Sequence, residues 1–373
     1  MPPAESASAP ARMLSVDALR GFDMFWIMGA DGLVAALHEL SDWPLVAFAA
    51  EQLEHRQWHG FTFYDLIFPL FIYVVGVSIV LSLGKKRDEL ADRGELYARI
   101  VRRALVLYVL GVLFYGGLSN SLNEIRWVGV LQRIAVCYLC GAIVFLNLRP
   151  RGQAILLTGI LLGYWALMTL VPVPGFGSGD FTPEGNLAGH VDRLLLPGRA
   201  WFRDLGWDPE GLLSTIPAIG SCLIGLLSGE LLANVRVLPQ KKVWLLVAAA
   251  TVALAVGFAW GNWFPINKKM WTSSYTLVAG GYSCLLLALF YQTIDIWQWR
   301  RWCFPFVVIG SNAIFIYIAA EIVPFDQIAQ RFVGGEIAAR LGNWAGVVAI
   351  VVQLALEFAI LWWMYTKRIF IRI

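Results

Sequence analysis

Charged side chains are scarce in this sequence of 373 residues. Asp, Glu, Lys and Arg make up 15% of it, whereas a soluble domain carries about 25% charged residues. This scarcity excludes an ordinary soluble globular protein. The formal net charge of +3 is too small to indicate a nucleic-acid partner. Only five cysteines are present, mostly within apolar runs, so a disulfide framework of the secreted kind is not expected.

Apolar residues dominate instead, at 58% of the chain. A helix needs roughly 20 mostly apolar residues to cross about 30 Å of hydrocarbon. The sequence therefore predicts an all-α integral membrane protein with about ten transmembrane helices. We expect residues 1–12 to be a disordered tail and residues 13–373 to form a single transmembrane domain. The expected spans are 18–40, 64–84, 98–118, 127–147, 152–172, 211–234, 243–263, 272–292, 303–323 and 344–366.

The distribution of basic residues predicts the orientation of these spans. Lys and Arg concentrate in cytoplasmic loops. With the N-terminus inside, nineteen of the 29 Lys and Arg residues fall on the cytoplasmic side, and nine fall on the outer side. Both termini are therefore expected in the cytoplasm, with two long outer loops at 41–63 and 173–210. Short loops elsewhere suit the inner membrane of a bacterium, which is the expected location.

Several ionisable residues fall inside or beside the expected spans, where they are costly unless they face a polar cavity or a partner. Asp23 and Asp31 lie on the first span and Arg133 lies on the fourth. Arg133 has two interpretations, an ion pair that serves assembly or a site for a phosphate or carboxylate ligand. Asp65 opens the second span, where an acid also complements the helix dipole without any further role.

Two histidines, His55 and His59, lie four residues apart in the first outer loop. This spacing occurs in zinc sites, but a third ligand is not evident, so no metal is expected. Proton transfer is the alternative use, because a histidine near neutral pH can accept a proton from an attacking amine or hydroxyl. An ordinary interfacial histidine remains open as well. Cys137 and Cys140 lie within one span and are interpreted as packing residues, because thiolates are disfavoured in hydrocarbon.

Seven strings, taken together and in order, resemble the heparan-alpha-glucosaminide N-acetyltransferase family and its bacterial relatives in the transmembrane acyltransferase superfamily. The resemblance covers residues 13–370. The strings are SVDALRGFDMFWI (15–27), HRQWHGFTFYDLIFPLFIYVVGVSI (55–79), GVLQRIAVCYL (129–139), GHVDRLLLPG (189–198), WDPEGLLSTIPAIGSCLIGLLSGELL (207–232), PINKKMWTSSYTL (265–277) and GSNAIFIY (310–317).

The resemblance implies an enzyme that moves an acetyl group from cytoplasmic acetyl-CoA to an amino sugar on the outer, periplasmic side. It implies His55 as the active-site histidine, since the family's histidine precedes a pattern H-x-x-W-x-G. Asp31 matches the position of a family asparagine, and we expect it to orient His55. Direct transfer with His55 as base and a covalent acetyl-histidine are both left open.

The remaining site residues are hypotheses built on this resemblance. CoA phosphates are expected at a cytoplasmic mouth, and the pantetheine arm is expected in a tunnel through the helices. The residues expected to bind the donor are Arg20, Arg102, Arg103, Gln132, Arg133 and Asn312. The residues expected to bind the acceptor or its oxyanion are Trp58, Asp65, Asn267 and Lys268.

A transporter of N-acetylglucosamine or a related sugar is the alternative function. Asp23, Asp31, Arg133 and Glu321 would then form a set of proton-coupling groups. The expected partners are membrane lipid, acetyl-CoA and a small amino sugar, with no nucleic acid. A homodimer is left open.

Overall fold

The computed structural model describes residues 13–41, 43–88, 93–119 and 121–371, and the expected tail at 1–12 lies outside these ranges. The described chain is mostly helical. Its elements are α1 (Leu14–Phe25), the π-helical turn η1 (Trp26–Ala30), α2 (Asp31–Leu40), α3 (Pro44–Gln52), α4 (Phe63–Asp88), α5 (Arg93–Phe114), the 3₁₀ turns η2 (Gly117–Ser119) and η3 (Leu122–Glu124), α6 (Val130–Asn147), α7 (Pro150–Leu170), β1 (Pro172–Val173), β2 (Gly177–Ser178), α8 (Leu187–Leu195), α9 (Thr215–Ala233), α10 (Pro239–Trp260), α11 (Ser273–Phe290), the π-helical η4 (Tyr291–Ile296), α12 (Phe304–Ser311), α13 (Ala313–Ile322), α14 (Phe325–Val333), α15 (Glu336–Leu341), the 3₁₀ turn η5 (Gly342–Trp344) and α16 (Ala345–Thr366).

Within the described ranges, seven helices are long and apolar enough to cross a membrane. The pair α12 and α13 raises this number to eight if it counts as one span, although the pair is bent by 73°. Residues 18–40 and 98–118 are also largely helical, but they do not meet the same criterion. The structure therefore supports an all-α membrane protein, while the count of ten spans and the orientation stay predictions.

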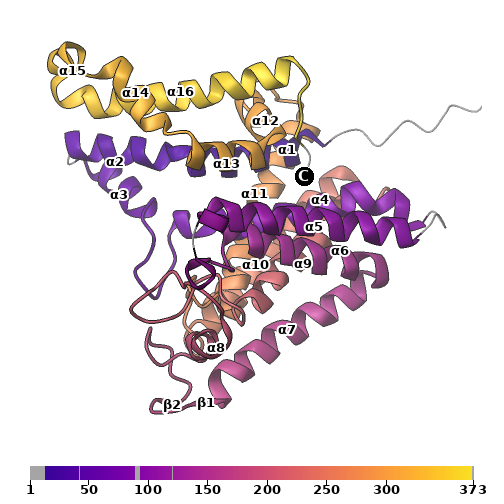
Figure 1. Cartoon of the computed structure of the whole chain (residues 1–373). Helices are drawn as coiled ribbons and strands as arrows, with labels where there is room; N and C mark the ends of the chain where they lie inside the picture. Colours follow the sequence, from indigo (N-terminus) through magenta and orange to yellow (C-terminus); the bar gives the residue numbers. More distant parts are fainter. Residues whose placement is uncertain (1–12, 42, 89–92, 120, 372–373) are drawn as a thin grey trace, which may run out of the picture.

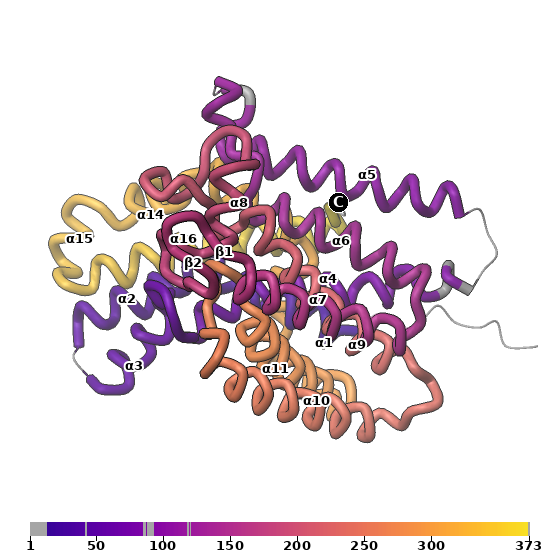
Figure 2. Tube along the Cα trace, turned by 90° about the horizontal axis from the view of Figure 1, so that it is seen from below, coloured from indigo at the N-terminus to yellow at the C-terminus, as the bar shows by residue number. Residues whose placement is uncertain are grey.

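The helices pack in layers (Figure 1). One layer contains α1, α2, α12, α13, α14 and α16, with α1 packed on α12 and α14 packed on α16. A central layer contains α4, α5, α6 and α9, in which α4 packs along α9 and α5 along α6. Helix α1 also contacts α4 and α11, so it joins the two layers. In Figure 2, α10 and α11 run side by side on the face opposite α5.

Close packing of α1 on α12 depends on two glycines. A Cβ atom on Gly21 would overlap the backbone carbonyl of Phe306, and one on Gly310 would overlap that of Asp17. Without side chains at these positions, the two backbones approach directly, as small residues allow between membrane helices. The pair therefore fixes the distance between α1 and α12.

The first expected span is broken at Gly29, whose φ of 106° lies in the left-handed region. The break leaves the carbonyl of Met28 available, and Gln353 Nε2 donates to it at 3.4 Å. The same amide donates to Glu357 Oε1 at 3.2 Å. A side chain on α16 thus supports the π-helical turn between α1 and α2. Turns of this kind often kink an α-helix.

Both long connections contain secondary structure. Residues 41–63 include α3, and residues 173–210 include α8. The first part of the second connection is the antiparallel hairpin of β1 and β2, with Pro172 opposite Ser178. Trp58 Nε1 donates to the carbonyl of Phe181 at 2.8 Å and so joins the two connections. In Figure 1, α2 and α3 lie at the left of the view, and α8 and the hairpin lie below them.

The segment after α16 returns to the bend between α12 and α13. Asn312, which separates these helices, donates from Nδ2 to the carbonyl of Ile369 at 2.9 Å. Its Oδ1 accepts the N–H of Ile371, also at 2.9 Å. Asn312 is buried, so its amide satisfies backbone groups that would otherwise lack partners at the bend.

Candidate active site

His55, Asp65 and Lys268 meet at the edge of a cavity. His55 Nδ1 lies 2.9 Å from Asp65 Oδ1. An ionised carboxylate only accepts hydrogen bonds, so Nδ1 is the donor, and in the neutral imidazole Nε2 then keeps its lone pair. Lys268 Nζ lies 3.1 Å from each ring nitrogen and 3.6 Å from Asp65 Oδ1. The Asp65 side chain is 1% exposed, whereas that of His55 is 48% exposed. A buried anion therefore holds a histidine whose other side is open.

The local sequence positions Asp65 in the first turn of α4. Its Oδ2 accepts hydrogen bonds from the N–H of Thr62 at 3.2 Å and from Thr62 Oγ1 at 3.1 Å. The N–H of Arg56 approaches the same oxygen at 3.4 Å. The chain reverses between these residues at Gly60, whose φ is 118°. This reversal brings His55 back to Asp65, which lies ten residues further along the chain.

Tyr64 places Asp31 in the neighbourhood of the site. The ring of Tyr64 packs on that of His55, with centroids 4.6 Å apart. The hydroxyl of Tyr64 interacts with the carboxylate of Asp31. Asp31 was expected to orient His55, but the carboxylate that bonds to the imidazole belongs to Asp65. Asp31 instead interacts with Tyr64, whose ring packs on that of His55.

Lys268 is the cation of the site. Burial lowers the pKa of Lys268 to about 8, and the anions of Asp65 and Glu210 oppose this effect. The side chain is 22% exposed, so partial contact with water remains. At neutral pH most of the molecules thus carry an ammonium beside the imidazole. This charge can stabilise an oxyanion that forms nearby.

A cavity of about 230 Å³ opens beside these groups. Its polar wall contains His55, Tyr64, Glu210, Lys268 and Tyr317. The apolar wall is formed by side chains of α1, η1, α4, α6 and α13, namely Met24, Ile27, Ile67, Phe68, Phe71, Val130, Leu131, Ile134 and Ile314. Binding sites for drug-sized ligands measure about 300–1,000 Å³, so this space suits a narrow arm or a single small group.

A second cavity of about 360 Å³ shares Met24, Ile27 and Tyr317 with the first. Gly29 and Gln353 also line this second cavity, next to the break in the first span. The two spaces therefore adjoin across a thin wall of side chains.

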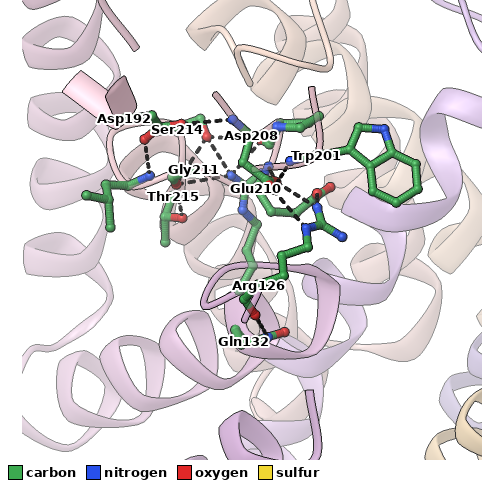
Figure 3. A network of polar contacts seen from close by, with 12 residues as sticks. Arg126, Gln132, Asp192, Trp201, Asp208, Glu210, Gly211, Ser214 and Thr215 are labelled. Atoms are coloured by element: carbon green, nitrogen blue, oxygen red, sulfur yellow. Dashed lines mark hydrogen bonds and ion pairs between the residues drawn. The ribbon is translucent and has the colours of Figure 1, made fainter. Parts of the chain in front are cut away.

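A network of charged side chains adjoins the cavity through Glu210, which lines it (Figure 3). Arg126 donates to Asp208 through Nε at 2.8 Å and through Nη2 at 2.7 Å. The same Nη2 donates to Glu210 Oε2 at 2.7 Å. Asp208 also accepts the N–H of Trp201 at 2.9 Å. Two carboxylates thus share one guanidinium, which fixes the loop before α9 against the segment before α6.

Asp192 on α8 accepts hydrogen bonds from the backbone of this loop. It accepts the N–H of Asp208 at 3.2 Å and that of Leu212 at 2.9 Å. Burial raises the pKa of Asp192 to about 6, although the two N–H donors oppose the shift. The carboxylate is thus part of the loop's internal hydrogen bonding.

Two residues expected to bind the donor, Arg133 and Gln132, contact the loop before α9 and the carbonyl of Arg126, respectively. Arg133 Nη2 donates to Ser214 Oγ at 2.5 Å and to the carbonyl of Pro209 at 2.8 Å. The Nε and Nη1 of Arg133 are buried without a hydrogen-bond partner among the described residues. Gln132 Nε2 approaches the carbonyl of Arg126 at 3.4 Å. Both side chains support backbone carbonyls, and Arg133 keeps unused donors.

The other residues expected to bind the donor have separate partners. Arg20 donates to Ser78 Oγ at 2.5 Å and lies 3.7 Å from Asp17. Arg103 is exposed, with its guanidinium 4.6 Å from the ring centroid of Tyr138, and Arg102 is exposed beside it. Asn312 holds the segment after α16, as described above. Their assignment to CoA stays a prediction.

Asn267 and Trp58, which were expected to bind the acceptor, connect the loops around His55. Asn267 is fully buried and donates to the carbonyl of Trp58 at 2.8 Å. Its Oδ1 accepts the N–H of Met270 at 2.9 Å. These contacts fix the turn that carries Lys268. His59 Nδ1 lies 3.4 Å from the Asn267 amide, away from the contacts of His55.

Sequence reasoning did not select Tyr64, Arg126, Asp208 or Glu210. The string WDPEG contains the last two acids, and its acids stand next to a proline and a glycine just before a span. Acids at the entrance to an apolar helix could have signalled a buried network. Tyr64 gave no such signal, because aromatic residues are common at helix starts near a membrane interface.

The family model described as heparan-alpha-glucosaminide N-acetyltransferase, catalytic, matches residues 12–242, which is more than half of the chain. The chain belongs to this family. It is 25% identical over 380 aligned residues to heparan-alpha-glucosaminide N-acetyltransferase of Mus musculus, covering 86% of this chain and 56% of the mouse protein. It is 27% identical over 325 residues to the Homo sapiens protein of that name, covering 72% of this chain and 48% of the human protein. The chain spans about half the length of these curated relatives. The matched range contains His55, Asp65 and Glu210.

Proposed function

We propose that this chain is a membrane-embedded acetyltransferase that moves an acetyl group from acetyl-CoA to the amine of an amino sugar of the glucosamine type. One observation carries the proposal, namely that His55 is held by buried Asp65 at 2.9 Å and faces a narrow cavity that also contains Lys268. Membership in the family supports an acetyl transfer. The site contains a base, its orienting acid and a cation, which are the groups that acyl transfer requires.

In the proposed reaction, Asp65 accepts the Nδ1–H of His55 and stabilises the imidazolium that forms. Nε2 removes a proton from the acceptor nitrogen as this nitrogen attacks the thioester carbonyl. The Lys268 ammonium stabilises the resulting oxyanion. His55 then returns the proton to the leaving sulfur, which yields the amide and a free thiol. An acetyl-histidine would form instead if Nε2 attacked the thioester itself.

The donor is proposed to enter from the cytoplasm and to reach His55 through the apolar part of the cavity. The side chains of α4, α6 and α13 that line this part suit a thin and weakly polar arm. The exposed arginines of α5 would attract the phosphates of CoA at the opposite end of the molecule. An inner bacterial membrane, with the acceptor outside, completes the proposal.

Purified protein in detergent tests the reaction. Wild-type protein should release free CoA thiol from acetyl-CoA when glucosamine is present, and His55→Ala should lower this rate by at least 10²-fold. Acid quenching followed by peptide mass spectrometry would reveal an acetyl group on residue 55 if the covalent route operates. Wild-type protein that binds no acetyl-CoA and releases no thiol with any amino sugar would refute the function and favour a transporter.

A further inference from the structure

Glu210 is the one carboxylate in the wall of the His55 cavity among the described residues. It belongs to the loop before α9, whereas His55 and Asp65 flank the start of α4. Its side chain is 15% exposed. Glu210 thus reaches the same space as His55 and Lys268 from a different part of the chain.

The two acids near the cavity differ in the use of their oxygens. Asp65 is 1% exposed, and both of its oxygens accept hydrogen bonds from the surrounding protein, Oδ1 from His55 and Oδ2 from Thr62. Glu210 accepts at Oε2 from Arg126, and the residue lines the cavity with a side chain that is 15% exposed. Only Glu210 can therefore present negative charge to a molecule inside the cavity.

An amine acceptor needs such a group. At neutral pH a primary amine is mostly an ammonium ion, as the α-amino pKa of about 8 illustrates. An ammonium has no lone pair, so it must lose one proton before it can attack, and it loses a second proton during the attack. His55 can accept one of these protons in the proposed reaction, and the other requires a second acceptor.

The surroundings of Glu210 suit that task. Burial raises the pKa of Glu210 above its ordinary value, and the neighbouring Asp208 raises it further, while Arg133 and Arg126 oppose the shift. A glutamate with raised proton affinity takes a proton from an ammonium more readily than an exposed one. Arg126 holds the carboxylate in place, so its position does not depend on the ligand.

We propose that Glu210 binds the charged amine of the acceptor and takes its first proton, an inference that rests on the proposed acetyl transfer. In this step the N–H bond of the ammonium breaks, its electron pair stays on nitrogen, and the proton moves to a Glu210 oxygen. The neutral amine then attacks the thioester while His55 accepts the second proton. His55 passes that proton to the leaving sulfur, and Glu210 releases its proton to solvent after the product leaves.

The variant Glu210→Gln tests this step, because the amide oxygen still accepts from Arg126 while the charge is lost. Two acceptors are compared at pH 7, glucosamine, which is largely protonated, and methoxyamine, which is already neutral. A charge-assisted hydrogen bond corresponds to about 10- to 100-fold in rate, so kcat/KM for glucosamine should fall by about that factor. For methoxyamine it should change less than about threefold. Glu184→Gln is the matched control, because Glu184 is exposed in the same connection and lies outside the cavity lining, and it should change neither rate.

Equal losses with both acceptors, or no loss with either, would overturn the role of Glu210 while leaving the acetyl transfer intact. Wild-type protein inactive with every amine would instead refute the proposed function. If Glu210→Gln does not purify as a monodisperse species, the role of Glu210 is tested by sugar binding to the wild-type protein in the absence of acetyl-CoA. Glucosamine should then bind at least about tenfold more tightly than glucose, which has a hydroxyl in place of the amine. Equal affinities would refute the subsite.

Discussion

Replacing Asp65 by asparagine is the sharpest test of the candidate site, because it changes one atom and one charge. Oδ2 accepts two hydrogen bonds from Thr62, so the amide oxygen should take that position. The amide NH₂ then points toward His55 Nδ1. Because an NH₂ group only donates, Nδ1 must become the acceptor and the proton moves to Nε2. The nitrogen that should act as base would lose its lone pair.

The expected loss follows from this contact. The bond between His55 and Asp65 measures 2.9 Å and one partner is fully buried, so the charge-assisted bond contributes about 1.5–3 kcal/mol. This corresponds to a factor of about 10 to 10² in kcat, and the change of tautomer adds to it. We therefore expect Asp65→Asn to lower kcat by about 10² or more. The KM for acetyl-CoA should change little, because neither group is expected to hold the donor.

The assay is thiol release from acetyl-CoA under saturating glucosamine, measured on protein that elutes as a single species. Asp31→Asn is the matched control, since it makes the same chemical change at the acid that interacts with Tyr64. It should cost less than about tenfold in kcat. The double variant His55→Ala with Asp65→Asn should equal His55→Ala alone, because the two residues act as one unit. A larger loss of kcat from Asp31→Asn than from Asp65→Asn, or additive losses in the double variant, would refute the pairing of His55 with Asp65.

Three further predictions concern charge and packing. The acetyl-transfer rate should fall above about pH 8, because Lys268 carries its proton below that pH and loses it above. The variant Lys268→Met should have a lower rate at neutral pH and should lack this alkaline decline. Arg126→Leu leaves buried Asp208 and partly buried Glu210 without their cation, and it should lower the free energy of unfolding by about 3–5 kcal/mol. Arg203→Leu at an exposed ion pair should change this free energy by less than about 0.5 kcal/mol, and denaturant titration in micelles measures both values. Gly21→Ala should lower the unfolding temperature through overlap with α12, whereas Gly84→Ala meets no neighbour and should leave it unchanged or raise it.

The spans could be predicted from sequence wherever an apolar run is unbroken. Residues 127–147 were expected as a helix, and α6 covers Val130–Asn147. The span expected at 18–40 is instead divided by a π-helical turn at Gly29. At this turn Gln353, more than 300 residues away, donates to the carbonyl of Met28. Hydropathy averages over a window and contains no information on such a contact.

The candidate site was likewise predicted only in part from the sequence. His55 was selected from its place ahead of a span and from the family resemblance. Its partner Asp65 was expected as an acceptor-binding residue or a helix-start acid, and the pairing of the two residues was not predicted. The pairing requires the chain to reverse at Gly60, whose N–H donates to the carbonyl of Ile266 at 2.9 Å. That contact also brings the turn with Lys268 against His55, and only the tertiary structure contains it.

Buried polar residues were the hardest to assign. Arg133, Asn267 and Asn312 were all expected to contact substrates, since polar groups in apolar surroundings suggest function. In the structure each bonds to backbone carbonyls of loops or helix breaks. Irregular backbone buried in a membrane protein also needs hydrogen-bond partners, and a sequence does not distinguish the two needs. Whether these side chains contact substrates as well stays a prediction.

The two hydrogen bonds of Asn312 have a practical consequence for work on this protein. Because Ile369 and Ile371 bond to Asn312 at the bend between α12 and α13, the segment that contains them supports the interior of the protein. An affinity label or fluorescent fusion joined directly after Ile371 would disturb that bend. A spacer that leaves Ile371 in place should preserve it, and the choice of linker therefore belongs to the design of every measurement suggested above.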